Sequence, residues 1–574
     1  MKRTKYAVLG ATTLALALGI SGCSGGSGGS TSTVNATQGA SDQGKLPTTA
    51  WDTADYSAVK AGGTLTLPIS ALPSNWNSGT VDGNNSDQIN VLLNSTTGGP
   101  VRIKDDGTWE MDPNYATEVK LVSSDPQVVE VKLNPKAVWS DGTPMTYKDF
   151  QSAWKAFNGT DTSFQVASTN VWEDISSVDR TDSDSNFKMT FKNKNADWPS
   201  ILVSPSYEAS VTKDAATFND AYKSTPVPSS GPYEVSKVDT TGQVVTLKPN
   251  PKWWGEKPKL DTIIVKSIES QDALAQAYAN KEVDALGIGS GIVSPDVYNT
   301  ASKRDDGEIQ RAGGLTWYHF DFNAKVAPLD DVKVRQGIAR AINRDTIAQS
   351  RLAPLGAPVT TQNNYIYMPG QKGYTDDATS TIGYDVAKAG ALLDDAGWKK
   401  GSDGMRAKDG KPLTISVTVP SGTATSANAA KQIQANLKDV GVTLTIDSVP
   451  VAKFFSDYVT TTDKKNFQTT LFSWVGTPFP VSSSLSIFYP ADGPQNYNGV
   501  TDASLGDMWK QANAELDPDK QRALAQKIDQ TIFSYVPMVP ISPTPTVSAV
   551  KKGLVNLGAV QFQTVDWTKV GWKN

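Results

Sequence analysis

The chain has 574 residues, a formal net charge of −5 at pH 7, one cysteine and one histidine. This length exceeds what a single hydrophobic core usually organises, so we expect at least two lobes. A slightly acidic chain without a basic stripe gives no support for nucleic-acid binding. One cysteine and one histidine also supply too few ligands for a zinc site.

The N-terminus carries the pattern of an exported protein. Three basic residues among the first five precede an apolar run over residues 7–20. This run is shorter than the roughly 20 residues that span a bilayer, and it is typical of a secretory signal peptide. The Ile-Ser-Gly-Cys sequence that ends at Cys23 resembles a bacterial lipobox. We therefore expect a signal peptide over residues 1–22 and a lipidated Cys23, which would hold the protein on the outer face of the cell membrane. An ordinary signal peptide followed by an unmodified cysteine is the alternative.

Residues 23–50 are expected to form the lipidated cysteine and a flexible linker. Of the 27 residues from Ser24 to Ala50, 16 are Gly, Ser or Thr. Such a segment cannot bury enough apolar surface to order itself, so it should act as a tether for the body that follows.

Beyond residue 60, strand and helix patterns alternate along the chain. Strands are predicted over residues 63–67, 260–267, 415–419 and 442–446, and helices over residues 271–280, 384–396 and 428–440. Gly397 and Gly441 are placed to end the last two helices. Strand, helix and strand with short connections predict a βαβ unit, and hence an α/β fold with a largely parallel sheet.

His319 lies in an alternating stretch that is typical of a strand. A Ser-His-Asp hydrolase would need this residue, but no Gly-x-Ser-x-Gly nucleophile elbow is found nearby. We therefore expect a structural or cleft-lining role for His319, with a catalytic or metal-binding role as the alternative. No cofactor and no enzymatic activity are predicted.

Several motifs occur in a fixed order between residues 61 and about 545. They are Val-Trp-Ser-Asp-Gly-Thr-Pro-Met-Thr-Tyr-Lys-Asp-Phe at 138–150, Gly-Pro-Tyr at 231–233, Asn-Pro-Lys-Trp-Trp at 250–254, Glu-Val-Asp at 282–284, Val-Arg-Gln-Gly-Ile at 334–338, Ala-Ile-Asn-Arg at 341–344 and Ala-Gly-Trp at 396–398. Together they resemble the extracytoplasmic solute-binding proteins of family 5, which include the oligopeptide- and dipeptide-binding proteins of ABC importers. Most of these motifs are expected to stabilise the fold without contacting the ligand. Thr146, for example, is placed to cap a helix.

The resemblance implies a periplasmic-binding-protein-like type II fold, with two lobes around a ligand cleft that close by a hinge motion. Lobe I would comprise residues 51–93, 225–313 and 537–574, with an inserted subdomain at 94–224, and lobe II would comprise residues 314–536. The expected partners are a small-molecule or peptide ligand, the permease subunits of an ABC importer and the membrane through the lipid anchor. The protein is expected to be a monomer.

The resemblance also places the ligand near Trp474, Val475, Gly476 and Thr477. In peptide-binding relatives this segment offers main-chain groups to the ligand, and an aspartate three residues after the tryptophan holds the α-ammonium. Here that position is Thr477, and residues 466–491 contain no Asp, Glu, Lys or Arg. Because a threonine hydroxyl cannot neutralise a buried ammonium, we expect the cleft to be locally neutral.

Six other residues are candidates for ligand contact. Trp172 and Trp317 are either ligand-facing or core residues, since large aromatic rings dominate burial. Asp82 and Asn84 align with a first-lobe loop near the ligand, and Asp82 is either a substitute ammonium partner or a solvated turn residue. Gly289 and Ser290 follow a strand, and their backbone can approach a ligand; the lysine that follows the glycines of a P-loop is missing.

The sequence thus predicts a binding protein that captures oligopeptides and delivers them to an ABC permease. An oligosaccharide or another neutral solute is the alternative ligand, because hydroxyl groups beside aromatic rings also suit sugars. Nickel or haem capture is disfavoured by the single histidine. An exported hydrolase and a signalling receptor that kept the fold are the alternatives from other classes.

Overall fold

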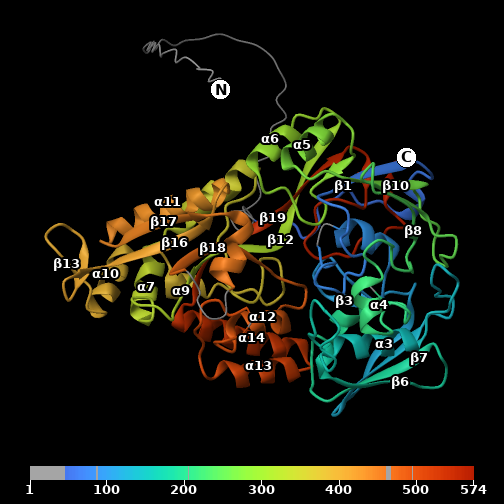
Figure 1. Ribbon diagram of the computed structural model, residues 1–574, viewed down its shortest axis with the longest axis horizontal. Coiled ribbons are helices and arrows are strands. Elements are labelled where there is room, and N and C mark those ends of the chain that lie inside the picture. The colour runs from blue at the N-terminus through green and yellow to red at the C-terminus, as the bar shows by residue number, and fades with distance from the viewer. Residues whose placement is uncertain (1–44, 86–87, 204–205, 461–466, 494) are drawn as a thin grey trace, which may run out of the picture. The chain divides into compact units, whose positions relative to one another are not determined.

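The computed structural model describes residues 45–85, 88–203, 206–460, 467–493 and 495–574 (Figure 1). The predicted signal peptide, Cys23 and most of the linker lie outside the described residues. Within the described part of the chain, no helix combines the length and the apolar character needed to cross a membrane.

A four-stranded sheet is built from segments far apart in the sequence. Its order is β1 (Thr64–Ile69), β10 (Thr262–Ser267), β9 (Val244–Pro249) and β8 (Tyr233–Asp239). β1 and β10 are parallel and the other pairs are antiparallel. Alternate residues such as Leu65, Leu67 and Ile263 are fully buried, as expected for strands with one face on a core. The strands predicted over 63–67 and 260–267 are thereby confirmed.

A six-stranded sheet combines strands from three separate stretches of the chain, at residues 285–322, 414–475 and 538–551. Its order is β11 (Ala285–Leu286), β19 (Met538–Lys551), β12 (Gly307–Phe322), β18 (Thr469–Val475), β16 (Thr414–Pro420) and β17 (Thr443–Val449). The long strands β12 and β19 pair from Gly307 opposite Lys551 to Asp321 opposite Met538, and they cross the middle of Figure 1. The predicted lobe boundary at residues 313 and 314 falls inside β12. The domain bounds themselves stay a prediction.

The expectation of a largely parallel sheet was wrong. Only β16 pairs in parallel within this sheet, with β17 and with β18, whereas β12 runs antiparallel to both of its neighbours. The predicted βαβ unit is present as β16, α11 and β17 and gives the parallel pairs. The pairing of β12 with β18 and β19 is long-range and leaves no local pattern, so the sequence did not reveal it.

Helices cover the six-stranded sheet and fill the space around it. Their bounds are α5 (Gln271–Ala279), α6 (Pro295–Ala301), α7 (Val332–Ala341), α8 (Arg344–Leu352), α9 (Ala378–Ile382), α10 (Val386–Asp395), α11 (Ala424–Asp439), α12 (Pro480–Phe488), α13 (Leu505–Ala514) and α14 (Pro518–Tyr535). The three predicted helices are confirmed as α5, α10 and α11. Gly397 and Gly441 have φ angles of +87° and +80° after their helices, in the left-handed region that glycine tolerates best.

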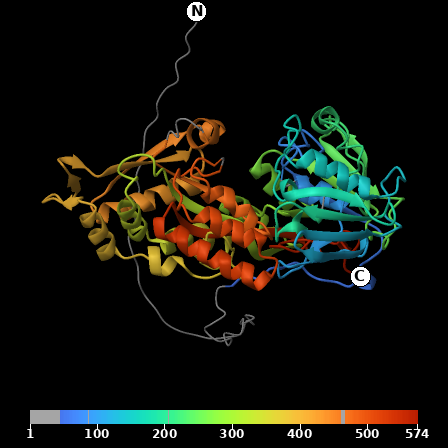
Figure 2. The same cartoon turned by 90° about the horizontal axis from the view of Figure 1, so that it is seen from below.

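A second four-stranded sheet lies between residues 116 and 191 and is entirely antiparallel. Its order is β4 (Ala116–Ser124), β5 (Gln127–Leu133), β7 (Asn186–Phe191) and β6 (Ile175–Arg180), and Figure 2 shows it in teal and cyan. Helix α3 (Tyr147–Phe157) packs on it through Phe150, which stacks on Phe187 at 4.6 Å. The predicted cap is confirmed: Lys148 N donates to Thr146 Oγ1, and Thr146 N donates to Asp149 Oδ2 at 2.7 Å.

Shorter elements complete the body. They are β2 (Val101–Ile103), β3 (Trp109–Met111), α2 (Asn94–Thr96), α4 (Ala215–Asp220), β13 (Lys399–Lys400), β14 (Arg406–Lys408), β15 (Lys411–Pro412), β20 (Leu554–Val555), β21 (Gly571–Trp572) and the helical turns η1 (Tyr56–Ala58), η2 (Ile89–Leu93), η3 (Trp172–Asp174), η4 (Trp198–Leu202), η5 (Ala353–Leu355), η6 (Val451–Lys453) and η7 (Phe454–Val459).

Candidate ligand site

Trp474 stands near the end of β18 in a cluster of aromatic rings. Its indole stacks on Tyr497 with ring centroids 5.4 Å apart and meets Phe472 edge-on at 5.3 Å. Phe472 in turn contacts Phe455 of η7, whose side chain is 47% exposed. We call Phe455, Phe472, Trp474 and Tyr497 the Trp474 surface. Phe472 is buried, whereas Phe455, Trp474 and Tyr497 stay partly exposed, and partly exposed aromatic rings are typical of a ligand-binding face.

His319 lies directly behind this surface and is fully buried. Its Nδ1 donates to Asp321 Oδ2 at 2.5 Å, and Asp321 also accepts from Asn498 Nδ2 at 2.7 Å. The His319 ring packs edge-on against Phe472 at 4.3 Å and lies nearly parallel to Trp474 at 6.0 Å. The histidine therefore supports the two rings from inside. In the described part of the chain, no group of acidic, histidine or cysteine residues could hold a metal ion.

Thr477 is held in a turn of neutral polar groups. Its hydroxyl contacts Ser483 Oγ at 3.1 Å and accepts from Phe479 N at 3.1 Å, while its carbonyl accepts from Gln371 Nε2 at 2.9 Å. The main-chain N–H of Gly476 donates to the carbonyl of Leu315 at 2.6 Å. This N–H is therefore already used within the protein, while Val475 between Trp474 and Gly476 is 70% exposed.

One chain segment from the N-terminal half contacts the helix that follows Thr477, and a second segment contacts the first. Val81 N donates to Gln165 O at 3.1 Å, which ties the loop of Asp82 and Asn84 to the segment before Trp172. Asn170 Nδ2 then donates to Ser482 Oγ at 3.4 Å, in the helix that follows Thr477. These hydrogen bonds place the loop of Asp82 and Asn84 beside the segment before Trp172, and that segment beside α12. Asp82 and Asn84 are exposed, and Trp172 is partly buried against Phe157, with the rings stacked at 5.7 Å.

Gly289 and Ser290 are exposed and lie close to the same loop. A Cβ atom at Gly289 would fall 2.2 Å from Asn90 Nδ2, and Asn90 belongs to η2, the turn that follows Asp82 and Asn84. A larger residue at position 289 would force the Asn90 side chain to move, and the positive φ of +79° also favours glycine here.

Trp317 differs from the other candidates. It is opposite Trp474 in the β12–β18 pair, but it is only 3% exposed and its ring contacts His319 and Tyr365. Of the two roles considered for Trp317, this burial matches the core role and does not support direct ligand contact.

The sequence resemblance and the fold agree with comparisons to known proteins. Residues 110–496 match the family described as "Bacterial extracellular solute-binding proteins, family 5 Middle". The oligopeptide-binding protein OppA of Mycobacterium tuberculosis is 34% identical over 521 residues, covering 90% of this chain and 86% of that protein. The chain belongs to family 5 of the bacterial extracellular solute-binding proteins. The resemblance stated from the motifs is thereby confirmed, and members of this family are transport binding proteins rather than enzymes.

Solved structures confirm the periplasmic-binding-protein-like type II fold. The periplasmic EDTA-binding protein EppA superposes with a TM-score of 0.82 at 25% identity, covering 93% of this family 5 chain and 99% of EppA. The oligopeptide-binding protein AppA of Bacillus subtilis, in complex with a nonapeptide, superposes with a TM-score of 0.71 at 19% identity, covering 90% and 100%. These two relatives bind different ligands on one fold, so the fold alone does not identify the ligand of this chain.

Sequence reasoning missed three features of the site. Phe455 and Tyr497 lie outside the motif around Trp474 and join it only through tertiary packing. Asp197 was also missed: it is 5% exposed and accepts from Ser482 N at 2.9 Å and from Gln521 Nε2 at 3.3 Å. A carboxylate at the start of α12 is favourable because unpaired N–H groups and the positive end of the helix dipole meet there. No local pattern around residue 197 indicated this role.

Proposed function

We propose that this family 5 protein captures oligopeptides outside the cell and delivers them to the permease subunits of an ABC importer. The Trp474 surface carries this proposal. Three of its four rings are partly exposed, and the turn after Trp474 adds the neutral hydroxyls of Thr477 and Ser483, which suits peptide planes and apolar side chains. The names of relatives such as OppA of Mycobacterium tuberculosis support the same ligand class.

We further propose that the bound peptide's N-terminus is not held by a carboxylate beside Thr477. The Thr477 hydroxyl contacts a serine hydroxyl and accepts from a main-chain N–H, and both of these groups are neutral. A peptide ammonium in this turn would therefore lack a counter-ion, and burying an unpaired charge costs several kcal/mol. Peptides held along their backbone, with both ends reaching toward solvent, avoid this cost.

An oligosaccharide is the second candidate ligand. The neutral hydroxyls of Thr477 and Ser483 follow Trp474 closely in the chain, so hydroxyl groups accompany the aromatic faces. Sugars pack their apolar ring faces on such side chains and exchange hydrogen bonds with hydroxyl groups.

Calorimetry with the purified chain tests both candidates. Peptides of three to nine residues and neutral oligosaccharides of similar mass are titrated separately into the protein. The proposal expects heat of binding from peptides and none from sugars. Saturable binding of an oligosaccharide without peptide binding would overturn it. Peptide uptake by cells with and without the gene then tests delivery to the importer, since loss of the binding protein should abolish uptake.

The lipid anchor at Cys23 and the location on the outer face of the cell membrane belong to the same proposal. They are supported by the signal-peptide pattern and the lipobox-like sequence described above, and by membership of an extracellular solute-binding family.

A further inference from the structure

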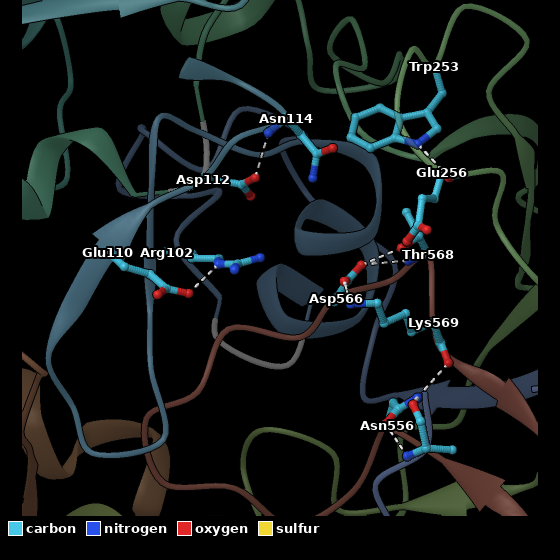
Figure 3. A network of polar contacts seen from close by, with 11 residues as sticks. Arg102, Glu110, Asp112, Asn114, Trp253, Glu256, Asn556, Asp566, Thr568 and Lys569 are labelled. Atoms are coloured by element: carbon cyan, nitrogen blue, oxygen red, sulfur yellow. Dashed lines mark hydrogen bonds and ion pairs between the residues drawn. The ribbon is translucent and has the colours of Figure 1, made fainter. Parts of the chain in front are cut away.

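A cavity of about 550 Å³ lies away from the Trp474 surface. Its lining comes from residues 51–56, 94–115, 232, 253–256 and 556–569, and none of the described lining residues belongs to 314–555. The volume falls within the roughly 300–1,000 Å³ range of small-molecule sites. Figure 3 shows Asp112, Asn114 and Asp566 around the same space, with Trp253 at its edge. This cavity therefore shares no residue with the proposed peptide site.

The charge of the lining is unbalanced. Three basic side chains line the cavity, and each already has a carboxylate partner: Arg102 with Glu110 at 2.7 Å, Lys569 with Asp566 at 3.1 Å and Lys104 with Asp106 at 3.7 Å. Four further carboxylates of the lining form no ion pair with any described residue: Asp55, Asp105, Asp112 and Glu256. A cation would restore the balance, whereas an anion would add to the repulsion.

Asp112 is the best placed of these carboxylates to meet a ligand. It is partly buried, and one of its oxygens, Oδ1, accepts from Asn114 N at 2.9 Å. Burial raises the pKa of its carboxyl, and the nearby Asp566 raises it further against the opposing effects of Asn114 and Arg102. A carboxylate that is desolvated and close to a second carboxylate is stabilised by a bound cation.

Trp253 and Trp567 are among the lining residues of the cavity. Trp253 is held in place by the hydrogen bond from its Nε1 to Glu256 O at 2.9 Å and by ring contacts with Trp254 at 4.7 Å and Tyr115 at 5.9 Å. Such a fixed aromatic wall favours organic cations. Trp567 also lines the cavity, but it is only 2% exposed and therefore offers a ligand little surface.

We propose that the cavity is a second small-molecule site, which binds a compact organic cation with a protonated primary amine. Asp112 is the ion partner of the amine, and Trp253 is the aromatic wall. Binding here is independent of the Trp474 surface.

Three matched probes test the charge requirement by calorimetry: phenylalaninamide (cation), N-acetylphenylalaninamide (neutral) and N-acetylphenylalanine (anion). We expect phenylalaninamide to bind at least about tenfold more tightly than either acetylated probe, because hydrogen bonds to charged groups are the stronger ones. Equal binding of the three probes, or no binding of phenylalaninamide at millimolar concentration, would overturn the proposal.

Four variants test whether phenylalaninamide binds in this cavity. Asp112→Asn keeps the oxygen that accepts from Asn114 N and removes the charge, so it should weaken phenylalaninamide binding at least about tenfold. Trp253→Leu removes the aromatic wall, so it should weaken binding less than Asp112→Asn, and it provides a second, independent variant. Asp409→Asn, at an exposed turn of lobe II, should leave it unchanged. Trp474→Ala should also leave it unchanged, and loss of binding in that variant would place the probe at the peptide site and refute the second site. Thermal unfolding of each variant shows that the fold is retained.

Discussion

The carboxylate of Asp197 accepts a hydrogen bond at 2.9 Å from the main-chain N–H of Ser482, which lies 285 positions further along the chain. The neighbouring Ala196 N donates to Asn513 O at 2.7 Å. A loop of the predicted inserted subdomain is therefore joined to α12 and to the end of α13, beside the turn that holds Thr477. This contact limits how far the two segments can separate when a ligand enters.

Asp197→Ala should weaken this junction. The change leaves the N–H of Ser482 without its partner, and an unpaired buried donor costs about 1–3 kcal/mol. We expect a lower free energy of unfolding in urea and a larger radius of gyration in small-angle scattering of the ligand-free protein. Asp125→Ala, at a carboxylate with an 84% exposed side chain, is the control. An unchanged radius of gyration together with unchanged stability would contradict the assigned role of Asp197.

Trp474→Ala should reduce peptide affinity more than any other single truncation in the Trp474 surface. Loss of a central aromatic anchor commonly costs on the order of 2 kcal/mol, or roughly thirtyfold in Kd. Calorimetry with one peptide measures the effect. Tyr384→Ala, at a ring that is 46% exposed and outside the site, should leave Kd unchanged. A Trp474→Ala variant with the affinity of the native protein would place the ligand elsewhere.

Thr477→Asp should shift ligand preference toward peptides with a free N-terminus. The new carboxylate can accept from Phe479 N and Ser483 Oγ, the present partners of the hydroxyl, so the turn should be preserved. The measurement compares Kd for free and N-acetylated forms of one peptide. If the native protein already binds the free form much more tightly, an ammonium partner exists elsewhere, and Asp82 is the next residue to replace.

Asp529 should make the stability of the fold depend on pH. It is fully buried; burial raises the pKa of its carboxyl well above the ordinary value, while the hydrogen bond from Tyr365 N opposes this and Asp377 adds to it. Because the folded-state pKa is the higher one, the protonated form favours folding. The stabilisation of the fold by the protonated Asp529 carboxyl is complete below the unfolded-state pKa of about 4. This stabilisation is lost as pH rises through the folded-state pKa.

Asp529→Asn should therefore flatten this dependence. The amide oxygen can still accept from Tyr365 N, and Asn364 Nδ2 retains its contacts with Thr375. Urea unfolding at several values between about pH 4 and pH 8 should show a smaller fall in unfolding free energy with rising pH than in the native protein. Asp409→Asn should follow the native curve. Parallel curves for the native protein and Asp529→Asn would disprove the assignment.

Cys23→Ser should release the protein from the membrane fraction into the medium. The signal-peptide pattern ends at Cys23, so the serine variant would lack the acyl chains that a bilayer retains. Cell fractionation and immunoblotting measure the distribution. Membrane retention of the serine variant in a strain that processes lipoproteins would refute the anchor.

Interactions between residues that are close in the sequence determine part of the local structure. The capping box of Thr146 and Asp149, the glycines that end α10 and α11, and the alternation of Leu65 and Leu67 depend on residues a few positions apart. Such interactions are encoded in short stretches, and the family motifs are built from them. Through the family resemblance these motifs were sufficient for the fold class, while the ligand role that the resemblance gives Trp474 stays a prediction.

Tertiary structure decided the rest, because the remaining features join residues that are distant in the chain. Trp317 and Trp474 look alike in sequence, but strand pairing buries the first and leaves the second in the aromatic surface with Tyr497. The cavity beside Asp112 needs Trp567 from the other end of the chain, and the Asp197 contact needs Ser482. Burial and long-range pairing are properties of the assembled core, and single-sequence patterns do not report them.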